Sequence, residues 1–77
     1  QIPINIYPNP VSHTITIEKT TEDESHIQIS NHLGQIIKSL STRNTNNSID
    51  LSDLNNGIYI VEIHTNGKIN RQKILKN

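Results

Sequence analysis

The run Leu54-Asn55-Asn56-Gly57-Ile58-Tyr59-Ile60-Val61-Glu62-Ile63, followed by Asn66-Gly67 and the closing stretch 68–77, decides the fold. The segment 58–65 is bulky on both faces, a pattern typical of a central strand. Asn66-Gly67 is the strongest short hairpin signal and predicts a two-residue type I′ turn. Lys68 to Leu75 should therefore pair back antiparallel to this strand. We expect a chain that closes in this way to be the C-terminal part of a longer protein.

Composition favours strands over helices along the whole chain. Of the 77 residues, 15 are Ile and none is Ala, Met, Phe or Trp. β-Branched side chains suit a pleated surface and lower helix propensity, and the best helix former is missing. The sequence therefore predicts an all-β protein, and its length allows one domain.

Five further segments read as strands. Apolar and polar residues alternate in 2–7, 14–18 and 26–30, whereas 35–40 and 49–51 are extended but less regular. We expect 14–18 and 26–30 to form a hairpin, and the adjacent Ile36 and Ile37 leave the inward face of their strand open. Seven strands about ten residues apart predict a small antiparallel β-sandwich. The predicted inward set is Ile15, Ile17, Ile27, Ile29, Leu54, Tyr59, Val61 and Ile63.

Glycine and proline mark the turns. Tyr7-Pro8-Asn9-Pro10 is expected to be a stiff corner, because each proline restricts its own φ and the preceding residue. We predict positive φ for at least two of Gly34, Gly57 and Gly67. The segment 52–57 is expected to begin with one turn of 3₁₀ helix capped by Ser52.

Charge and hydropathy exclude several classes of function. Seven basic and seven acidic residues give a formal net charge of zero, so no basic face for nucleic acid is expected. No apolar run approaches the ~20 residues that span a bilayer. No signal peptide is recognisable in the chain, and that of an exported parent protein is expected upstream of Gln1. Without cysteine, neither a disulfide nor a thiolate metal site is expected.

No group of residues has the spacing of an active site. The four histidines lie in separate segments and are interpreted as surface residues, because zinc needs three or four converging ligands. The acidic residues 22–24 are interpreted as a polar turn, with calcium a remote option. Tyr7 and Tyr59 are expected in the core, which leaves no aromatic platform for sugar. We therefore predict no enzyme activity, no cofactor, no metal and no small-molecule substrate.

Four landmarks together resemble a known family. They are the corner Tyr7-Pro8-Asn9-Pro10, Gly34 in the middle turn, the run 54–59 that opens the long strand, and the lysine-flanked end 73–76. In this order and at this spacing, the chain resembles the type A C-terminal sorting domain of the type IX secretion system of Bacteroidota. The resemblance covers Ile4 to Asn77. Asn55-Asn56 departs from it, standing where a small residue or proline is common.

The resemblance implies an immunoglobulin-like β-sandwich that serves as an export address without catalysis. The cargo would fold in the periplasm, the outer-membrane translocon would recognise the monomeric domain, and a surface sortase would remove it. The cargo would then be released or anchored at the cell surface. Lys73 and Lys76 are expected to be contact residues, because a sandwich core does not need them. The recognition residues implied are Tyr7, Pro8, Asn9, Pro10, Gly34, Leu54, Gly57, Tyr59, Lys73, Ile74 and Lys76.

The alternative from another class is a structural spacer or a cell-surface adhesion module of similar shape. Such a module would share the sandwich and would have no need of the four landmarks. It also need not stand at the end of its protein, whereas a sorting domain must. The two hypotheses therefore differ in whether the domain can carry a cargo across the outer membrane.

Overall fold

A computed structural model describes residues 4–77, and within this range it contains seven strands and no helix. The predicted all-β class is confirmed. Ile2 and Pro3, expected at the start of the first strand, lie outside the described residues. The strands are β1 (Ile4–Tyr7), β2 (Thr14–Lys19), β3 (Ser25–Asn31), β4 (Ile36–Thr42), β5 (Asn46–Asp50), β6 (Gly57–Thr65) and β7 (Lys68–Lys76).

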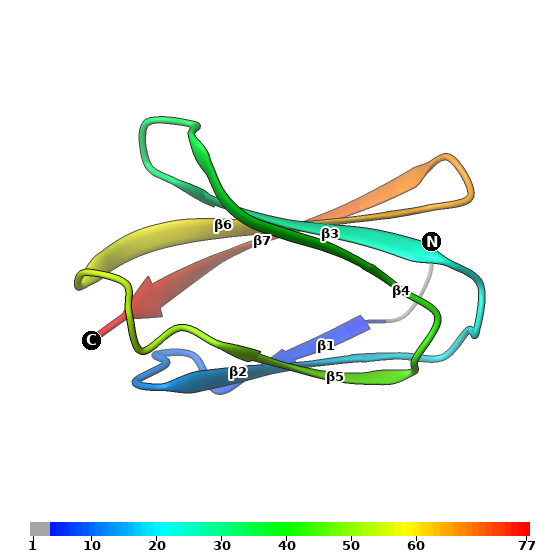
Figure 1. Ribbon diagram of the computed structural model, residues 1–77, viewed down its shortest axis with the longest axis horizontal. Coiled ribbons are helices and arrows are strands. Elements are labelled where there is room, and N and C mark those ends of the chain that lie inside the picture. The colour runs from blue at the N-terminus through cyan, green and yellow to red at the C-terminus, as the bar shows by residue number, and fades with distance from the viewer. Residues whose placement is uncertain (1–3) are drawn as a thin grey trace.

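The strands form two sheets that pack face to face. One sheet has the order β1-β2-β5 and the other β4-β3-β6-β7, and all five strand pairs are antiparallel. Figure 1 shows the four-stranded sheet above the three-stranded one, with the core between them. This arrangement is the small immunoglobulin-like sandwich that was predicted. β6 lies between β3 and β7, so its predicted central position is confirmed.

The predicted hairpin of 14–18 and 26–30 is wrong. β2 pairs with β1 and β5, whereas β3 pairs with β4 and β6 in the other sheet. The connection between them crosses the end of the sandwich, where the buried Lys19 ammonium donates to the carbonyl oxygens of Thr21 and Asp23, both at 2.8 Å. Alternation reports which face of a strand is buried and does not identify its partner, which explains the error.

The core consists of one inward face from each sheet. Ile15 and Ile17 are completely buried, so the predicted register of β2 is confirmed, and only Leu54 of the predicted inward set is partly exposed. The prediction omitted four core residues, among them Val11 and Ile74. The buried apolar residues are Val11, Ile15, Ile17, Ile27, Ile29, Ile49, Leu51, Tyr59, Val61, Ile63 and Ile74.

One polar pair is buried beside this apolar core. Ser25 and Thr65 lie directly opposite each other on β3 and β6, and their hydroxyl oxygens are 2.6 Å apart. Both residues are almost completely buried. The hydrogen bond between the two hydroxyls therefore replaces the bonds to water that each loses on burial.

The turns follow the predicted backbone chemistry. Asn66 and Gly67, at φ +51° and +78°, join β6 to β7 with positive φ at both positions, as a type I′ turn requires. Gly34 and Gly57 also have positive φ, at +84° and +152°, so the glycine prediction is confirmed. The expected 3₁₀ turn capped by Ser52 is wrong. Residues 51–54 instead form a single turn, in which the Leu54 N–H donates to the Leu51 carbonyl at 3.0 Å. The Asp50 carboxylate accepts the Ser52 backbone N–H at 2.9 Å.

Candidate functional site

The structure brings the first and last landmarks together, although they are more than sixty residues apart in sequence. The Asn9 side chain lies against the outer edge of β7. Its Oδ1 accepts the backbone N–H of Leu75 at 3.0 Å, and its Nδ2 donates to the carbonyl oxygen of Lys73 at 3.3 Å. A side-chain amide carries one acceptor and a donor group, as a peptide unit does. Asn9 therefore stands in for the neighbouring strand that β7 lacks at this point.

The backbone after the corner continues this pairing. Val11 donates to the carbonyl oxygen of Leu75 at 2.8 Å and accepts the N–H of Asn77 at 2.9 Å, which makes a short parallel bridge. The Ser12 hydroxyl reaches the side chain of Asn77 at 3.2 Å. Open strand edges are templates for pairing with other chains. Here residues 9–12 occupy the edge of the last part of β7, so that stretch is not free to add a strand.

The two prolines flank the residue that makes the contact. The peptide bonds before Pro8 and Pro10 are both cis. The ring of proline restricts its φ, so Asn9 lies between two residues with little backbone freedom.

Tyr7 is not a core residue, contrary to the prediction. It is 44% exposed, and its hydroxyl donates to Oε2 of Glu18 on β2 at 2.8 Å. This hydrogen bond is the main cause that raises the pKa of the Tyr7 phenol, with smaller contributions from burial and from the carboxylate charge. Tyr7 therefore braces the corner from the surface of the three-stranded sheet.

The terminal strand divides the closing motif between two faces. Ile74 and Lys76 point inward and are 1% and 5% exposed, whereas Lys73 and Leu75 point outward. The expectation that Lys76 is a surface contact residue is therefore wrong. Its position continues the inward alternation, and its Nζ lies 3.4 Å from the carbonyl oxygen of Asn77. The Lys73 ammonium is exposed and has no hydrogen-bond or ion-pair partner among residues 4–77.

The two remaining landmarks lie at the same end of the sandwich. The β-sheet register places Gly57 opposite Lys76 and Tyr59 opposite Asn31, which begins the turn that contains Gly34. Figure 1 shows this turn, the start of β6, the corner before β2 and the C-terminus together at the left. The landmarks scattered along the sequence thus form one end of the molecule.

Tyr59 and Leu54 support this end from inside. Tyr59 is 7% exposed, so its predicted inward position is confirmed. Its hydroxyl donates to the carbonyl oxygen of Asn55 at 2.7 Å. A tyrosine that bonds back to the corner before its own strand is the tyrosine corner of immunoglobulin-like domains. Leu54 packs against the core from the same loop. A recognition role for these two residues would therefore act through the shape they maintain.

A charged cluster lies on the outer face of the four-stranded sheet. Glu62 on β6 accepts from Arg71 on β7, and its other oxygen lies 3.0 Å from Nε2 of His64. The hydrogen bond with His64 and then that with Arg71 hold the pKa of Glu62 below its ordinary value. These contacts leave no charge of the cluster unpaired.

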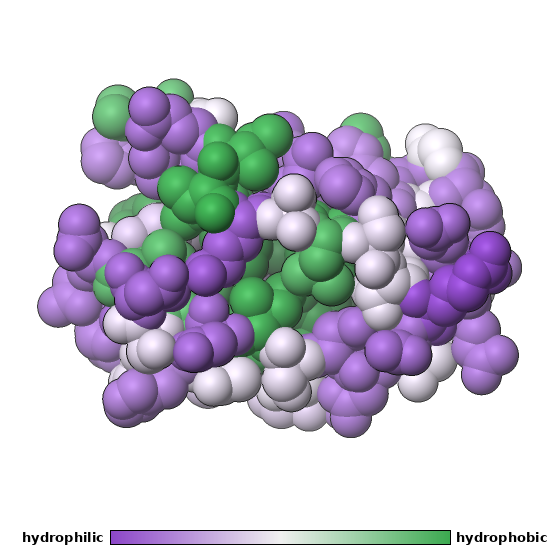
Figure 2. All heavy atoms as spheres, in the orientation of Figure 1, coloured by the Kyte–Doolittle hydropathy of each residue, from purple (hydrophilic) through white to green (hydrophobic). Residues whose placement is uncertain are grey.

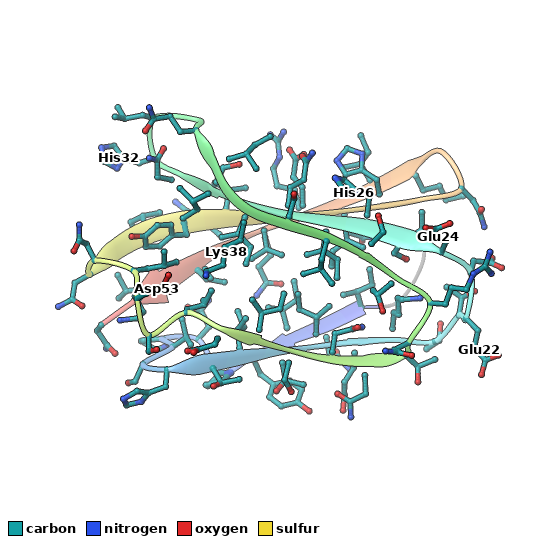
Figure 3. All side chains as sticks on the ribbon, viewed as in Figure 1. Glu22, Glu24, His26, His32, Lys38 and Asp53 are labelled. Atoms are coloured by element: carbon teal, nitrogen blue, oxygen red, sulfur yellow. The ribbon has the colours of Figure 1, made fainter. Side chains whose placement is uncertain are left out.

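Among residues 4–77, no three histidine, cysteine, aspartate or glutamate side chains gather to hold a metal ion. The register does place His26 directly opposite His64, which their sequence spacing could not reveal. Figure 3 shows His26 and His32 on the outer side of the four-stranded sheet, and Glu22 and Glu24 at the opposite end of the molecule from His32.

Comparison with known proteins places this fold in a family. A model of the secretion system C-terminal sorting domain matches residues 5–77. The chain therefore belongs to the family of C-terminal sorting domains of the type IX secretion system, as the four landmarks indicated. Family membership implies a secretion signal and a secreted or cell-surface protein; domains of this family are generally non-catalytic.

One similar solved structure is PorZ of Porphyromonas gingivalis, described as an essential bacterial surface component of the type IX secretion system. The two superpose with a TM-score of 0.75 at 15% identity, over 96% of this chain and 11% of that one. This chain thus spans about a tenth of PorZ, and the likeness supports the fold alone. No curated protein matches the sequence. The described residues include no helix long and apolar enough to cross a membrane.

Proposed function

We propose that this domain is the C-terminal address of a larger exported protein, and that the outer-membrane translocon reads its landmark end. The observation that carries the proposal is the joining of the corner to the terminal strand through Asn9 and Val11. A spacer has no evident need to assemble four sequence landmarks into one end of the fold. A signal must present the same surface whatever cargo precedes it. The joint between the corner and β7 fixes such a surface within the domain itself.

The proposed route follows from that role. The cargo reaches the periplasm, folds there, and crosses the outer membrane when the translocon engages the domain. A surface sortase then removes the domain, and the cargo is released or anchored. The domain contributes no chemistry of its own to these steps and acts as a folded monomer.

The test is transplantation. A periplasmic reporter fused in front of residues 1–77 is expressed in a host with a type IX system and in the same host lacking its translocon. We expect the reporter at the surface or in the medium of the first host and in the periplasm of the second. If the exported reporter is smaller than the fusion by the mass of the domain, the result would support the sortase step. If the intact fusion stays in the periplasm of the competent host, the spacer hypothesis replaces this proposal.

Deletion of residues 73–77 should also block export, but it cannot separate recognition from folding. It removes the buried Ile74 and every partner of the corner on β7. Reversing the charge of Lys76 has the same weakness, because that residue is buried. Lys73 is exposed and is the better probe of a recognised surface.

A further inference from the structure

The outer face of the four-stranded sheet carries apolar side chains at its landmark end. Ile58 on β6 lies directly opposite Leu75 on β7, and the two are 40% and 39% exposed. Ile60, one step further along β6, is half-buried, and Ile36 on the edge strand β4 is 56% exposed. We call Ile36, Ile58, Ile60 and Leu75 the apolar patch. Ile58, Ile60 and Leu75 alternate with the inward residues of their strands. Ile36 is in phase with the inward Leu40, and a register shift beside Ser30 places it on the outer face.

A shallow groove of about 520 Å³ runs across this patch. Ile36, Ile58 and Ile60 line it together with polar residues, and Leu75 lies beside it, opposite Ile58 on β7. Figure 2, which views the two sheets from the side, shows green apolar atoms at the surface beside the β3–β4 turn, next to purple polar ones. The register places Ser30 between Ile36 and Ile60, so the groove is lined by both apolar and polar side chains. Exposed apolar side chains beside polar ones are a common feature of protein interfaces.

The charges around the patch indicate what could cover it. Lys73 lies opposite Ile60 in the register, and its ammonium has no partner among residues 4–77. The other charges near the groove, Glu62 and Arg71, already neutralise each other. The patch therefore presents apolar area beside one positive charge that is not paired within residues 4–77, and this combination is complementary to an apolar surface that carries a carboxylate.

We propose that the apolar patch and Lys73 form the docking face of the domain for a protein partner that presents apolar side chains beside a carboxylate. This inference rests on the proposed function and identifies the surface that the secretion machinery reads. Asn9 acts as a positioning residue, because its bonds to the Lys73 carbonyl and the Leu75 N–H hold the backbone on both sides of Ile74, between the two outward side chains.

A second copy of the chain fits this face poorly. In a two-fold contact the same patch would meet itself. It would bring another Lys73 and no free carboxylate, since Glu62 is held by His64 and Arg71. A lipid surface also fits poorly, because stable electrostatic attachment needs a cluster of basic residues. A protein with its own carboxylate satisfies both features of the patch.

The experiment uses the reporter fusion with matched variants. The double variant Ile58→Thr, Leu75→Thr removes apolar area and keeps residues suited to strands. Its control is Ile69→Thr, which changes an apolar residue on the same face of β7 that is 60% exposed at the far end. A thermal melt of each purified domain checks folding.

A charge series tests the carboxylate separately. Lys73 is changed to Arg, Gln and Glu, with Lys68→Glu as the control at the start of the same strand. Since Lys73 is exposed, these variants should fold even if the apolar double variant does not. We expect export to fall in the order Arg, Gln, Glu, with Arg close to the parent.

The expected size follows from interface hot spots, where losing an anchor residue commonly costs about tenfold or more in binding. We expect the double variant to lose about tenfold in exported reporter, and both controls to stay near the parent. If the patch variants are exported like the parent, or the controls fall equally, the docking face is wrong while the secretion signal stands. If all three Lys73 variants are exported equally, the proposal that the partner carries a carboxylate beside Lys73 is wrong. A failure of the intact fusion overturns both proposals. If the parent domain sediments as a dimer that the double variant abolishes, the occupant is a second copy and this assignment is wrong.

Discussion

Replacing Asn9 with alanine should loosen the joint between the corner and the terminal strand. The change removes the two hydrogen bonds to β7, at 3.0 and 3.3 Å, and leaves the prolines in place. A hydrogen bond contributes about 0.5–1.5 kcal/mol net, and Asn9 is exposed, so the lower half of that range applies. We therefore expect Asn9→Ala to lower the free energy of unfolding by about 1–2 kcal/mol.

Urea unfolding of the isolated domain, followed by circular dichroism, measures this loss. For a domain of this size, 1 kcal/mol also corresponds to roughly 4–8 °C in Tm. The matched control is Asn5→Ala on β1, because Asn5 is an exposed amide whose side chain makes no hydrogen bond within residues 4–77. It should cost less than about 0.5 kcal/mol.

An isosteric variant separates the two bonds. Asn9→Asp keeps an acceptor for the Leu75 N–H but places a carboxylate oxygen against the carbonyl of Lys73. We expect it to be destabilised at neutral pH, with the deficit relative to the parent shrinking as the new carboxyl becomes protonated and can donate again. If Asn9→Ala unfolds within about 0.5 kcal/mol of the Asn5→Ala control, the amide does not stabilise the joint and this reasoning is refuted.

Four other substitutions, in three tests, probe the fold. Ser25→Ala or Thr65→Val alone should each cost about 1–3 kcal/mol by stranding a buried hydroxyl, whereas the double variant should cost less than their sum; additive losses in a double-mutant cycle would contradict this. Gly67→Val should cost more than about 1 kcal/mol by urea unfolding, because valine strains at φ +78°, and an unchanged midpoint would count against it. The lowered pKa of Glu62 makes the ionised form stabilising above its ordinary value of 4.5, and this contribution is lost as pH falls through the lower folded value. Glu62→Gln should therefore be less stable than the parent at pH 7, with the gap closing in acid; a gap independent of pH would show that the Arg71 and His64 contacts do not contribute.

The local structure could be read from the sequence because short-range chemistry decides it. Alternation gave Ile15 and Ile17 their inward face, since a strand has a period of two. Asn66-Gly67 specified its own turn through the φ values that these residues tolerate. The four landmarks indicated the family that the comparison with its model then showed. The inward faces and the turn depend on residues close in the chain, and the landmarks on the order and spacing of short motifs, so the sequence alone determined all three.

Only the tertiary structure decided which segments meet. No pattern in residues 14–30 shows that β2 and β3 belong to different sheets, because both partners would bury the same faces. The alternation that buries Lys76 and exposes Leu75 runs against their hydropathy, and packing at the end of the sandwich overrides it. The contact of Asn9 with β7 joins groups more than sixty residues apart, and it exists because two sheets stack and bring their edges together. Such contacts are consequences of topology, which local sequence does not encode.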